Sequence, residues 1–289
     1  MDLMKNIFSL HNNLKNKTYS HSTYHYFRIT DPKQRDIHKA SVRDRLLHHA
    51  IYRILHPFFF RNFTSDSHSC QNDKGTHRAL KRFKTFSNIV SKNNTKQCFI
   101  LKCDIKKFFA SIDHNLLRYI VAKYVPDEDI NWLLNQIISS FDKGLPLGNL
   151  TSQLLVNIYM NEFDQFVKHK LKVKYYIRYA DDFVVLSPSK NDLIKTWRYI
   201  AIFLSRELKL ELHPDKVFIK TLSSGVDFLG WVHFPNHRVL RTVTKRRMVR
   251  NISKNRSPET RASYMGMLKH GNTNKLKEMI ILSREADKI

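Results

Sequence analysis

The sequence has few glycines, prolines and cysteines, and half as many acidic as basic residues. Its 289 residues include only 7 Gly and 8 Pro, which favours long regular elements over a loop-rich fold. The 3 cysteines form no CxxC pair, so a disulfide scaffold and a zinc cluster are disfavoured and a reducing compartment is expected. No apolar run reaches the roughly 18 residues that span a bilayer. The first residues, MDLMKNIFSLHNN, lack the apolar core of a signal peptide. These absences predict a cytoplasmic protein without a membrane partner.

Positive charge is the main compositional feature. Fifty Lys and Arg against 25 Asp and Glu give a formal net charge of +25, and the 42% of hydrophobic residues allow a sizeable core. Such an excess predicts a polyanionic partner, with nucleic acid as the first expectation. An anionic membrane surface and a basic protein without a partner are the alternatives, although no basic amphipathic helix dominates the sequence.

Hydrophobic periodicity predicts an α+β fold, in which helices cover one face of a sheet. Helices are expected over residues 41–60, from about Thr76, and over 113–125, 127–140, 151–171 and 191–210. Strands are expected over residues 96–105, 174–179 and 183–187, and a strand or hairpin over 226–234. Pro57 is expected to end the first helix, and Asp113 to cap the third. Residues 1–34 carry few strong signals, and the chain beyond about Asn236 is expected to form a small basic helical lobe.

Three carboxylates stand at the ends of apolar strands. Asp104 ends the run CFILKCD, and Asp181 and Asp182 lie within IRYADDFVVLS. Asp181 and Asp182 could be ordinary turn aspartates whose side chains bond nearby amides, and Asp104 a strand-end or cap aspartate. Burying all three without a cation is costly, however, and hard divalent cations such as Mg²⁺ prefer oxygen ligands. Two such ions about 3.5–4 Å apart serve in-line phosphoryl transfer. The pattern therefore indicates a two-metal site acting on nucleic acid and a triphosphate.

Five blocks in this order resemble the motifs of reverse transcriptases. They are DIKKFFASID from Asp104, GLPLGNLTSQ, RYADD, HPDK and FLGW, and the resemblance extends from about Phe27 to Lys277. It implies a right-hand polymerase fold of fingers, palm and short helical thumb, with an antiparallel palm sheet backed by helices. The implied boundaries are fingers at 1–95 and 115–143, palm at 96–114 and 144–234, and thumb at 235–289.

The resemblance also implies roles for individual residues. Asp104, Asp181 and Asp182 would hold two Mg²⁺ ions, with Mn²⁺ as a substitute and the Ile105 carbonyl as a further ligand. The other implied site residues are Lys216 as proton donor to the pyrophosphate, Lys33 and Arg35 on the triphosphate, Phe109 under the sugar, Leu147 and Gly148 beside the nascent base pair, and Phe228, Leu229, Gly230 and Trp231 as the primer grip. The alternatives are solvated charge for Lys33 and Arg35, a core ring for Phe109, and an ordinary strand for FLGW.

The stretch LPLGNLTSQ is similar to that of enzymes from diversity-generating retroelements. Many other relatives have Gln in place of Leu147, and Ser-Pro in place of Ser152-Gln153. This implies an error-prone bacterial or phage-encoded enzyme that copies a template-repeat RNA into cDNA, using a DNA primer and dNTPs, with a small basic oligomeric accessory protein. Retron and abortive-infection reverse transcriptases are alternatives within the family. A catalytically silent nucleic-acid-binding protein and a nuclease are alternatives outside this activity.

Overall fold

The computed structural model describes residues 3–31, 33–255 and 257–285. The chain folds into two compact units. Unit 1 comprises residues 1–79, 102–185 and 194–217, and unit 2 comprises residues 80–101, 186–193 and 218–289. This division does not test the fingers, palm and thumb boundaries, which remain predictions.

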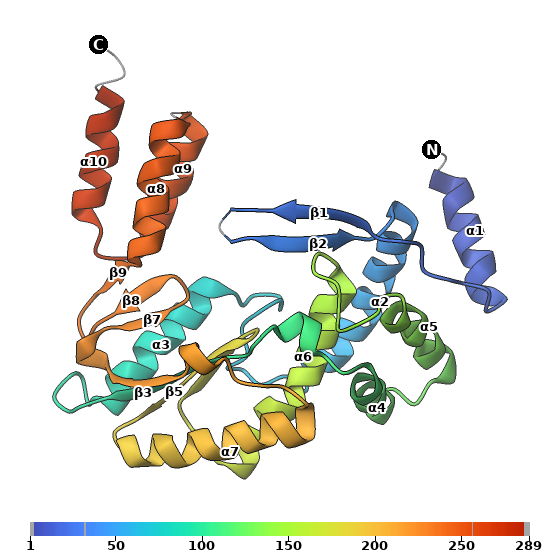
Figure 1. Cartoon of the computed structure of the whole chain (residues 1–289), viewed down its shortest axis with the longest axis horizontal. Coiled ribbons are helices and arrows are strands. Elements are labelled where there is room, and N and C mark those ends of the chain that lie inside the picture. The colour runs from blue at the N-terminus through green and yellow to red at the C-terminus, as the bar shows by residue number, and fades with distance from the viewer. Residues whose placement is uncertain (1–2, 32, 256, 286–289) are drawn as a thin grey trace. The chain divides into compact units, whose positions relative to one another are not determined.

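Unit 1 contains two β-hairpins and most of the helices (Figure 1). Its elements are α1 (Leu3–Lys15), β1 (His25–Ile29), β2 (Arg35–Lys39), α2 (Val42–Phe60), the 3₁₀ turn η1 (Phe108–Ser111), α4 (His114–Tyr124), α5 (Glu128–Ser139), α6 (Leu150–Gln165), the π-helical turn η2 (Phe166–Lys170), β4 (Tyr176–Tyr179), most of β5 (Asp182–Ser187), most of α7 (Lys190–Leu208) and the 3₁₀ turn η3 (Pro214–Lys216). Helix α6 is buried along most of its length, polar residues such as Asn157 and Asp164 included, because it packs against α2, α4 and η2.

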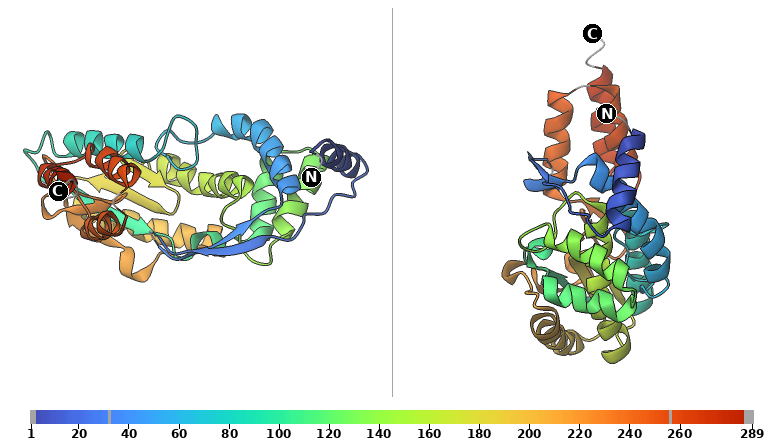
Figure 2. Two further views of the ribbon diagram at one scale, coloured as in Figure 1. Left: turned by 90° about the horizontal axis from the view of Figure 1, so that it is seen from above. Right: turned by 90° about the vertical axis from the view of Figure 1, so that its right-hand side faces the viewer.

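Unit 2 contains a three-stranded antiparallel sheet and three C-terminal helices that lie side by side in Figures 1 and 2. Its elements are most of α3 (Thr76–Val90), β6 (Phe218–Thr221), the 3₁₀ turn η4 (Leu222–Ser224), β7 (Val226–Phe228), β8 (Trp231–His233), β9 (Arg238–Leu240), α8 (Thr242–Lys254), α9 (Pro258–Leu268) and α10 (Asn274–Glu285). The Phe83 ring of α3 stacks on Phe228 at 5.6 Å between centroids and contacts His233 at 4.4 Å.

A four-stranded sheet has the strand order β4-β5-β3-β6, where β3 is Phe99–Asp104. Strands β3 and β5 each have four consecutive buried residues and then end at a half-buried position. Strands buried on both faces read as apolar runs rather than as an alternating pattern. Asp104 lies at one such strand end and Asp182 at one such strand start, so the sheet delivers both carboxylates to the edge of an apolar interior.

Most helices expected from the sequence are confirmed, but Pro57 does not end α2. The helix continues through Pro57 to Phe60. A proline inside a helix removes one hydrogen bond, here to the carbonyl of Arg53, whose residue is solvent-exposed. Phe59 is 1% exposed and its ring packs edge-on against Tyr124 at 5.9 Å. Burial of this ring therefore outweighs the loss of one bond that water can replace.

Two further expectations were incomplete. Residues 1–34 contain α1 and β1, although β1 has the sequence HYFRI with four of five residues exposed and so shows no alternation of apolar and polar positions. Strand β9 precedes the three C-terminal helices, so the region beyond Asn236 is not purely helical. No helix in the described ranges has the length and apolar character needed to cross a membrane.

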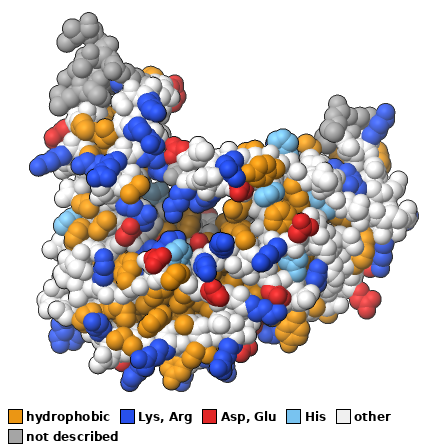
Figure 3. All heavy atoms as spheres, in the orientation of Figure 1, with side chains coloured by type: hydrophobic (Ala, Val, Ile, Leu, Met, Phe, Trp, Pro, Cys, Tyr) orange, Lys and Arg blue, Asp and Glu red, His pale blue; other side chains and the backbone are white. Residues whose placement is uncertain are grey.

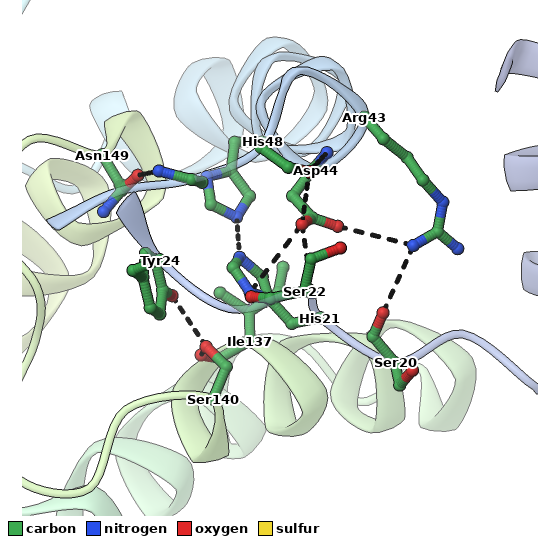
Figure 4. Close-up of polar contacts among 12 residues, drawn as sticks. Ser20, His21, Ser22, Tyr24, Arg43, Asp44, His48, Ile137, Ser140 and Asn149 are labelled. Carbon is green, nitrogen blue, oxygen red and sulfur yellow. Dashed lines mark hydrogen bonds and ion pairs between the residues drawn. The ribbon is translucent and has the colours of Figure 1, made fainter. Parts of the chain in front are cut away.

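A buried polar network joins the segment before β1 to helix α2 (Figure 4). The Asp44 carboxylate accepts hydrogen bonds from the Tyr19 hydroxyl at 2.9 Å, the Ser22 amide at 3.1 Å and the Ser41 hydroxyl at 2.7 Å. Beside it, the Nε2 atoms of His21 and His48 face each other at 3.3 Å. Burial lowers the pKa of His48 to about 4, so this ring is neutral near pH 7. The network anchors the start of the β1–β2 hairpin.

Candidate active site

The tight turn of the β4–β5 hairpin positions the adjacent aspartates. Tyr179 pairs with Asp182, so Ala180 and Asp181 alone form the turn. Ala180 has φ +55°, a left-handed conformation that is costly for a residue with a side chain. The Ile105 amide donates to the Asp181 carbonyl at 3.1 Å, which attaches the turn to the residue after Asp104. The backbone therefore brings Asp104, Asp181 and Asp182 together from two segments of the sheet.

A buried ion pair between Arg178 and Asp164 stabilises this turn. Arg178 is 1% exposed, and its guanidinium donates to both Asp164 oxygens at 2.8 and 2.6 Å. The same guanidinium donates to the Ala180 carbonyl at 3.2 Å and to the Ser67 hydroxyl at 2.9 Å. Two parallel bonds to a carboxylate fix the orientation of an arginine. Arg178 is therefore held in place and stabilises the strained residue that precedes Asp181.

The three carboxylates repel one another in a poorly solvated position. Burial raises the pKa of Asp182 to about 7, and the charges of Asp104 and Asp181 contribute to the rise while Lys102 opposes it. Burial and the Asp104 charge also raise the pKa of Asp181, against Lys216 and Lys33. Such shifts mark a site that needs additional positive charge when all carboxylates are ionised.

Two lysines supply part of that charge. Lys102, 7% exposed on β3, places its Nζ 3.4 Å from Asp182 Oδ2. Lys216 donates from Nζ to Asp104 Oδ1 at 2.9 Å. The segment before Lys216 follows the end of β3, because the Lys106 amide donates to the Glu211 carbonyl and the His213 amide to the Asp104 carbonyl. Lys216 therefore lies against the carboxylate cluster, and its role as a proton donor to the pyrophosphate remains a prediction.

The donor set fits a hard divalent cation. All three side chains offer carboxylate oxygens, which Mg²⁺ and Mn²⁺ prefer. Asp182 Oδ1 is buried without a hydrogen-bond partner among the described residues, so this oxygen is available to bind a cation. Within the same ranges, however, no three His, Cys, Asp or Glu side chains already surround one point as metal ligands. Asp104 and Asp182 instead face lysines, so metal binding requires these side chains to reorient.

The residues predicted to contact the sugar and the base pair lie on two segments that a backbone hydrogen bond joins. Phe109 is half-buried in η1, and its carbonyl accepts from the Leu145 amide at 2.8 Å. Gly144 at φ +69° makes this approach possible, since a Cβ there would lie 2.2 Å from the Phe109 carbonyl oxygen. Leu147 and Gly148 follow directly and are half-buried and exposed. The structure thus joins Phe109 to the Leu147 segment, and Phe109 is half-buried.

Lys33 and Arg35 belong to the β1–β2 hairpin. Both side chains are exposed, and Arg35 pairs with Ile29 at the outer end of the ladder. Lys33 lies close enough to the aspartates for its charge to lower the pKa of Asp181. For Arg35 the structure gives exposure and strand position but no contact with the aspartates.

The predicted primer grip forms the β7–β8 turn of unit 2. Phe228 pairs with Trp231, so Leu229 and Gly230 make a two-residue turn with φ +51° and +85°. Turns with two left-handed residues suit antiparallel hairpins. The hairpin reading of this stretch is confirmed, and its contact with a primer remains a prediction.

Sequence reasoning missed four residues of this site: Lys102, Asp164, Arg178 and Asn149. Lys102 and Arg178 carried a signal, because each is a charged residue within an otherwise apolar run, whereas Asp164 lies among polar residues. Buried charges are normally paired, so a charged residue in such a run predicts an oppositely charged partner. Asn149 had no such signal, since an Asn before a helix is usually just a cap.

The sequence matches the family model described as "Reverse transcriptase (RNA-dependent DNA polymerase)" over residues 30–233. This range includes every predicted site residue. The chain therefore belongs to the reverse transcriptase family, and its enzyme class is RNA-directed DNA polymerase.

Individual relatives agree with this class. Protein YkfC of Escherichia coli is 24% identical over 84% of this chain and 74% of its own length. The group II intron-encoded protein LtrA of Lactococcus lactis is 24% identical over 69% of this chain and 44% of its own length. The Retron Ec73 reverse transcriptase of Escherichia coli is 27% identical over 65% of this chain and 62% of its own length. The chain thus spans less than two thirds of the latter two proteins.

A solved structure shares the fold. Apo telomerase from Candida tropicalis, truncated from its C-terminal domain, matches with a TM-score of 0.56 and 13% identity, over 82% of this chain and 60% of that chain. At this identity the match concerns the mixed helix and sheet fold of a polymerase core alone.

Proposed function

We propose that the chain is a Mg²⁺-dependent, error-prone reverse transcriptase of the diversity-generating retroelement type, which copies a template-repeat RNA into cDNA. The observation that carries the polymerase chemistry is the convergence of Asp104, Asp181 and Asp182, where burial, together with the charges of Asp104 and Asp181, raises the pKa of Asp182 to about 7. The setting is proposed to be the cytoplasm of a bacterium, with the gene of bacterial or phage origin.

The three aspartates are proposed to hold two Mg²⁺ ions, with Mn²⁺ as a substitute and the Ile105 carbonyl as a further ligand. When bound, such ions activate the primer 3′-hydroxyl and stabilise the leaving pyrophosphate. Lys216 would leave Asp104 and approach the pyrophosphate, to which it donates a proton. Its side chain is 44% exposed, so this movement costs little burial.

Substrate positioning falls to the exposed hairpin and the Leu147 segment. Lys33 and Arg35 would bind the triphosphate of the dNTP, and Phe109 would exclude a ribose 2′-hydroxyl by steric contact. Phe228, Leu229, Gly230 and Trp231 would support the primer strand, with Gly230 allowing close backbone approach.

Leu147 is the basis for the proposed subtype and low fidelity. An alkyl side chain cannot form the hydrogen bond that Gln would offer near the incoming base. A missing hydrogen bond of about 0.5–1.5 kcal/mol weakens discrimination by roughly threefold to tenfold. A correct pair depends on such positioning more than a misaligned pair does.

The RNA template and a small basic, oligomeric accessory protein are the proposed macromolecular partners. Lys and Arg side chains are spread over the face drawn in Figure 3, in keeping with the net charge of +25. This charge supports extensive phosphate contacts.

A retron or defence-type reverse transcriptase is the second candidate. The observation in its favour is the 27% identity to the Retron Ec73 reverse transcriptase. The two candidates differ in the error rate of the cDNA, since only the diversity-generating enzyme is expected to make frequent errors opposite template adenine.

Primer extension on an RNA template, with the products sequenced, tests both the two-metal polymerase activity and the diversity-generating role. Extension that requires Mg²⁺ or Mn²⁺ and is lost in Asp181→Asn is expected. Near-normal extension by Asp181→Asn would overturn the two-metal assignment. Faithful copying of adenine by an active wild-type enzyme would leave the polymerase activity standing and refute the diversity-generating role.

A further inference from the structure

Asn149 stands at the N-cap position of α6 but does not cap the helix. Its side chain makes no hydrogen bond to the helix start, although Asn is among the best N-cap residues. Instead, Asn149 Nδ2 donates to the His38 carbonyl at 2.8 Å, and Asn149 Oδ1 accepts from the Ala40 amide at 3.1 Å. Asn149 is 2% exposed, and Figure 4 shows its amide directed at the backbone that leads into α2. The side chain thus holds the end of β2 with two bonds.

Neighbouring contacts extend this attachment. The His38 amide donates to the Leu147 carbonyl at 3.0 Å, so residues 147–149 run along β2 and bond to it from both main chain and side chain. Gly148 has φ +108°, and a Cβ there would lie 2.8 Å from Ile37 Cγ2. Glycine therefore permits both the backbone conformation and the close approach of the hairpin.

The opposite side of the hairpin base is also held. The His38 ring lies 4.8 Å from the Phe141 ring in an edge-on arrangement, and the Tyr24 hydroxyl bonds the Ser140 hydroxyl at 2.7 Å. The outer end, by contrast, carries the exposed Lys33 and Arg35. The base of the hairpin is therefore fixed to residues 140–149, whereas Lys33 and Arg35 at its outer end are exposed.

We infer that Asn149 is a positioning residue that fastens the β1–β2 hairpin to the Leu147 segment, so that the triphosphate-binding side chains and the base-pair side chain move as one body. This inference rests on the proposed function, because it assigns the hairpin to the dNTP. Binding of the triphosphate by Lys33 and Arg35 then sets the position of Leu147 through Asn149. If Asn149 served only to stabilise the start of α6, its side chain would be expected to cap that helix and not to bond the hairpin.

Loss of the link should appear in substrate affinity. Asn149→Ala removes both side-chain bonds and leaves the main-chain bond from His38 to Leu147, so the hairpin is held less firmly in register with Leu147. We expect the KM for dNTP to rise about tenfold, the equivalent of one to two hydrogen bonds, with kcat within about threefold of wild type. The fidelity gain expected from Leu147→Gln should disappear in the double variant, since that gain depends on the link.

The experiment compares Asn149→Ala and Asn149→Asp with Asn131→Ala in single-nucleotide incorporation on an RNA template. Asp caps a helix as well as Asn does but cannot donate to the His38 carbonyl. Asn131 is a matched control, because its Nδ2 also donates to two backbone carbonyls, those of Val125 at 2.6 Å and Asp127 at 2.9 Å. Urea unfolding of all variants separates folding defects from kinetic ones.

A raised KM in both Asn149 variants, with a normal KM in Asn131→Ala, would support the link. A wild-type KM in folded Asn149→Asp or Asn149→Ala would overturn it. Arg35→Ala tells this failure apart from failure of the proposed function. If Arg35→Ala raises the KM for dNTP and Asn149→Ala does not, the hairpin binds the triphosphate and only the link is wrong. If neither does, the hairpin assignment itself is wrong.

Discussion

Replacing Asp182 by Asn should stabilise the metal-free protein at alkaline pH while abolishing nucleotide addition. Asp182 is buried beside Asp104 and Asp181. Burial and the charges of these two residues raise its pKa from 3.8 to about 7. Between these two values the unfolded chain releases a proton that the folded chain retains, so stability falls as the pH rises. Above about pH 7 the full cost of the buried charge is present.

The shift sets the size of the effect. A pKa raised from 3.8 to about 7 corresponds to at most about 4 kcal/mol. Asp182 retains 19% of its side-chain exposure, and in Asp182→Asn the Lys102 ammonium loses its partner 3.4 Å away. Both effects reduce the gain. We therefore expect Asp182→Asn to raise the free energy of unfolding by about 1–3 kcal/mol at pH 8 and by little at pH 4.

Urea unfolding in EDTA at pH 4, 6 and 8 measures this difference. Asp142→Asn is the control, because Asp142 is an exposed carboxylate outside the cluster. Adding Mg²⁺ should raise the melting temperature of the wild type at pH 8 and leave Asp182→Asn unchanged. A variant that is destabilised at pH 8, or a difference that does not depend on pH, would refute the view that the three carboxylates form a site short of positive charge.

Four further predictions follow from the same structure. Phe109→Ala should lower the ratio of kcat/KM for dNTP over rNTP at least tenfold, and an unchanged ratio in an active variant would make Phe109 a packing residue. Leu147→Gln should reduce misincorporation opposite template adenine by roughly threefold to tenfold, measured by single-nucleotide kinetics, and an unchanged error rate would remove the role given to Leu147. Burial lowers the pKa of His48 from 6.5 to about 4, so the free energy of unfolding should fall as the pH drops from 6.5 to 4. Urea unfolding of His48→Gln should show a smaller fall over this pH range, and an equally steep fall would contradict the prediction. RNA affinity should fall steeply between 50 and 200 mM salt, roughly a hundredfold or more, in filter binding, and a shallow slope would argue against extensive phosphate contacts.

Local patterns in the sequence were sufficient for much of this protein. Asp113 was predicted as a cap, and its carboxylate accepts from the Leu116 amide at 2.8 Å. The apolar runs ending at Asp104 and around Asp182 predicted buried strands that deliver carboxylates to one place. These features depend on neighbours within a few residues, where capping and periodicity leave a clear record.

The tertiary structure decided the features that depend on distant residues. Strand β1 is exposed on both faces and leaves no periodic signal, and α2 continues past Pro57 because Phe59 is buried against Tyr124. The partners of Lys102 and Asn149 lie 80 and 109 positions away, so no local pattern could name them. The sequence by itself determined which residues could do the chemistry. Long-range packing and hydrogen bonding determined how their charges are balanced and which segments hold them in place.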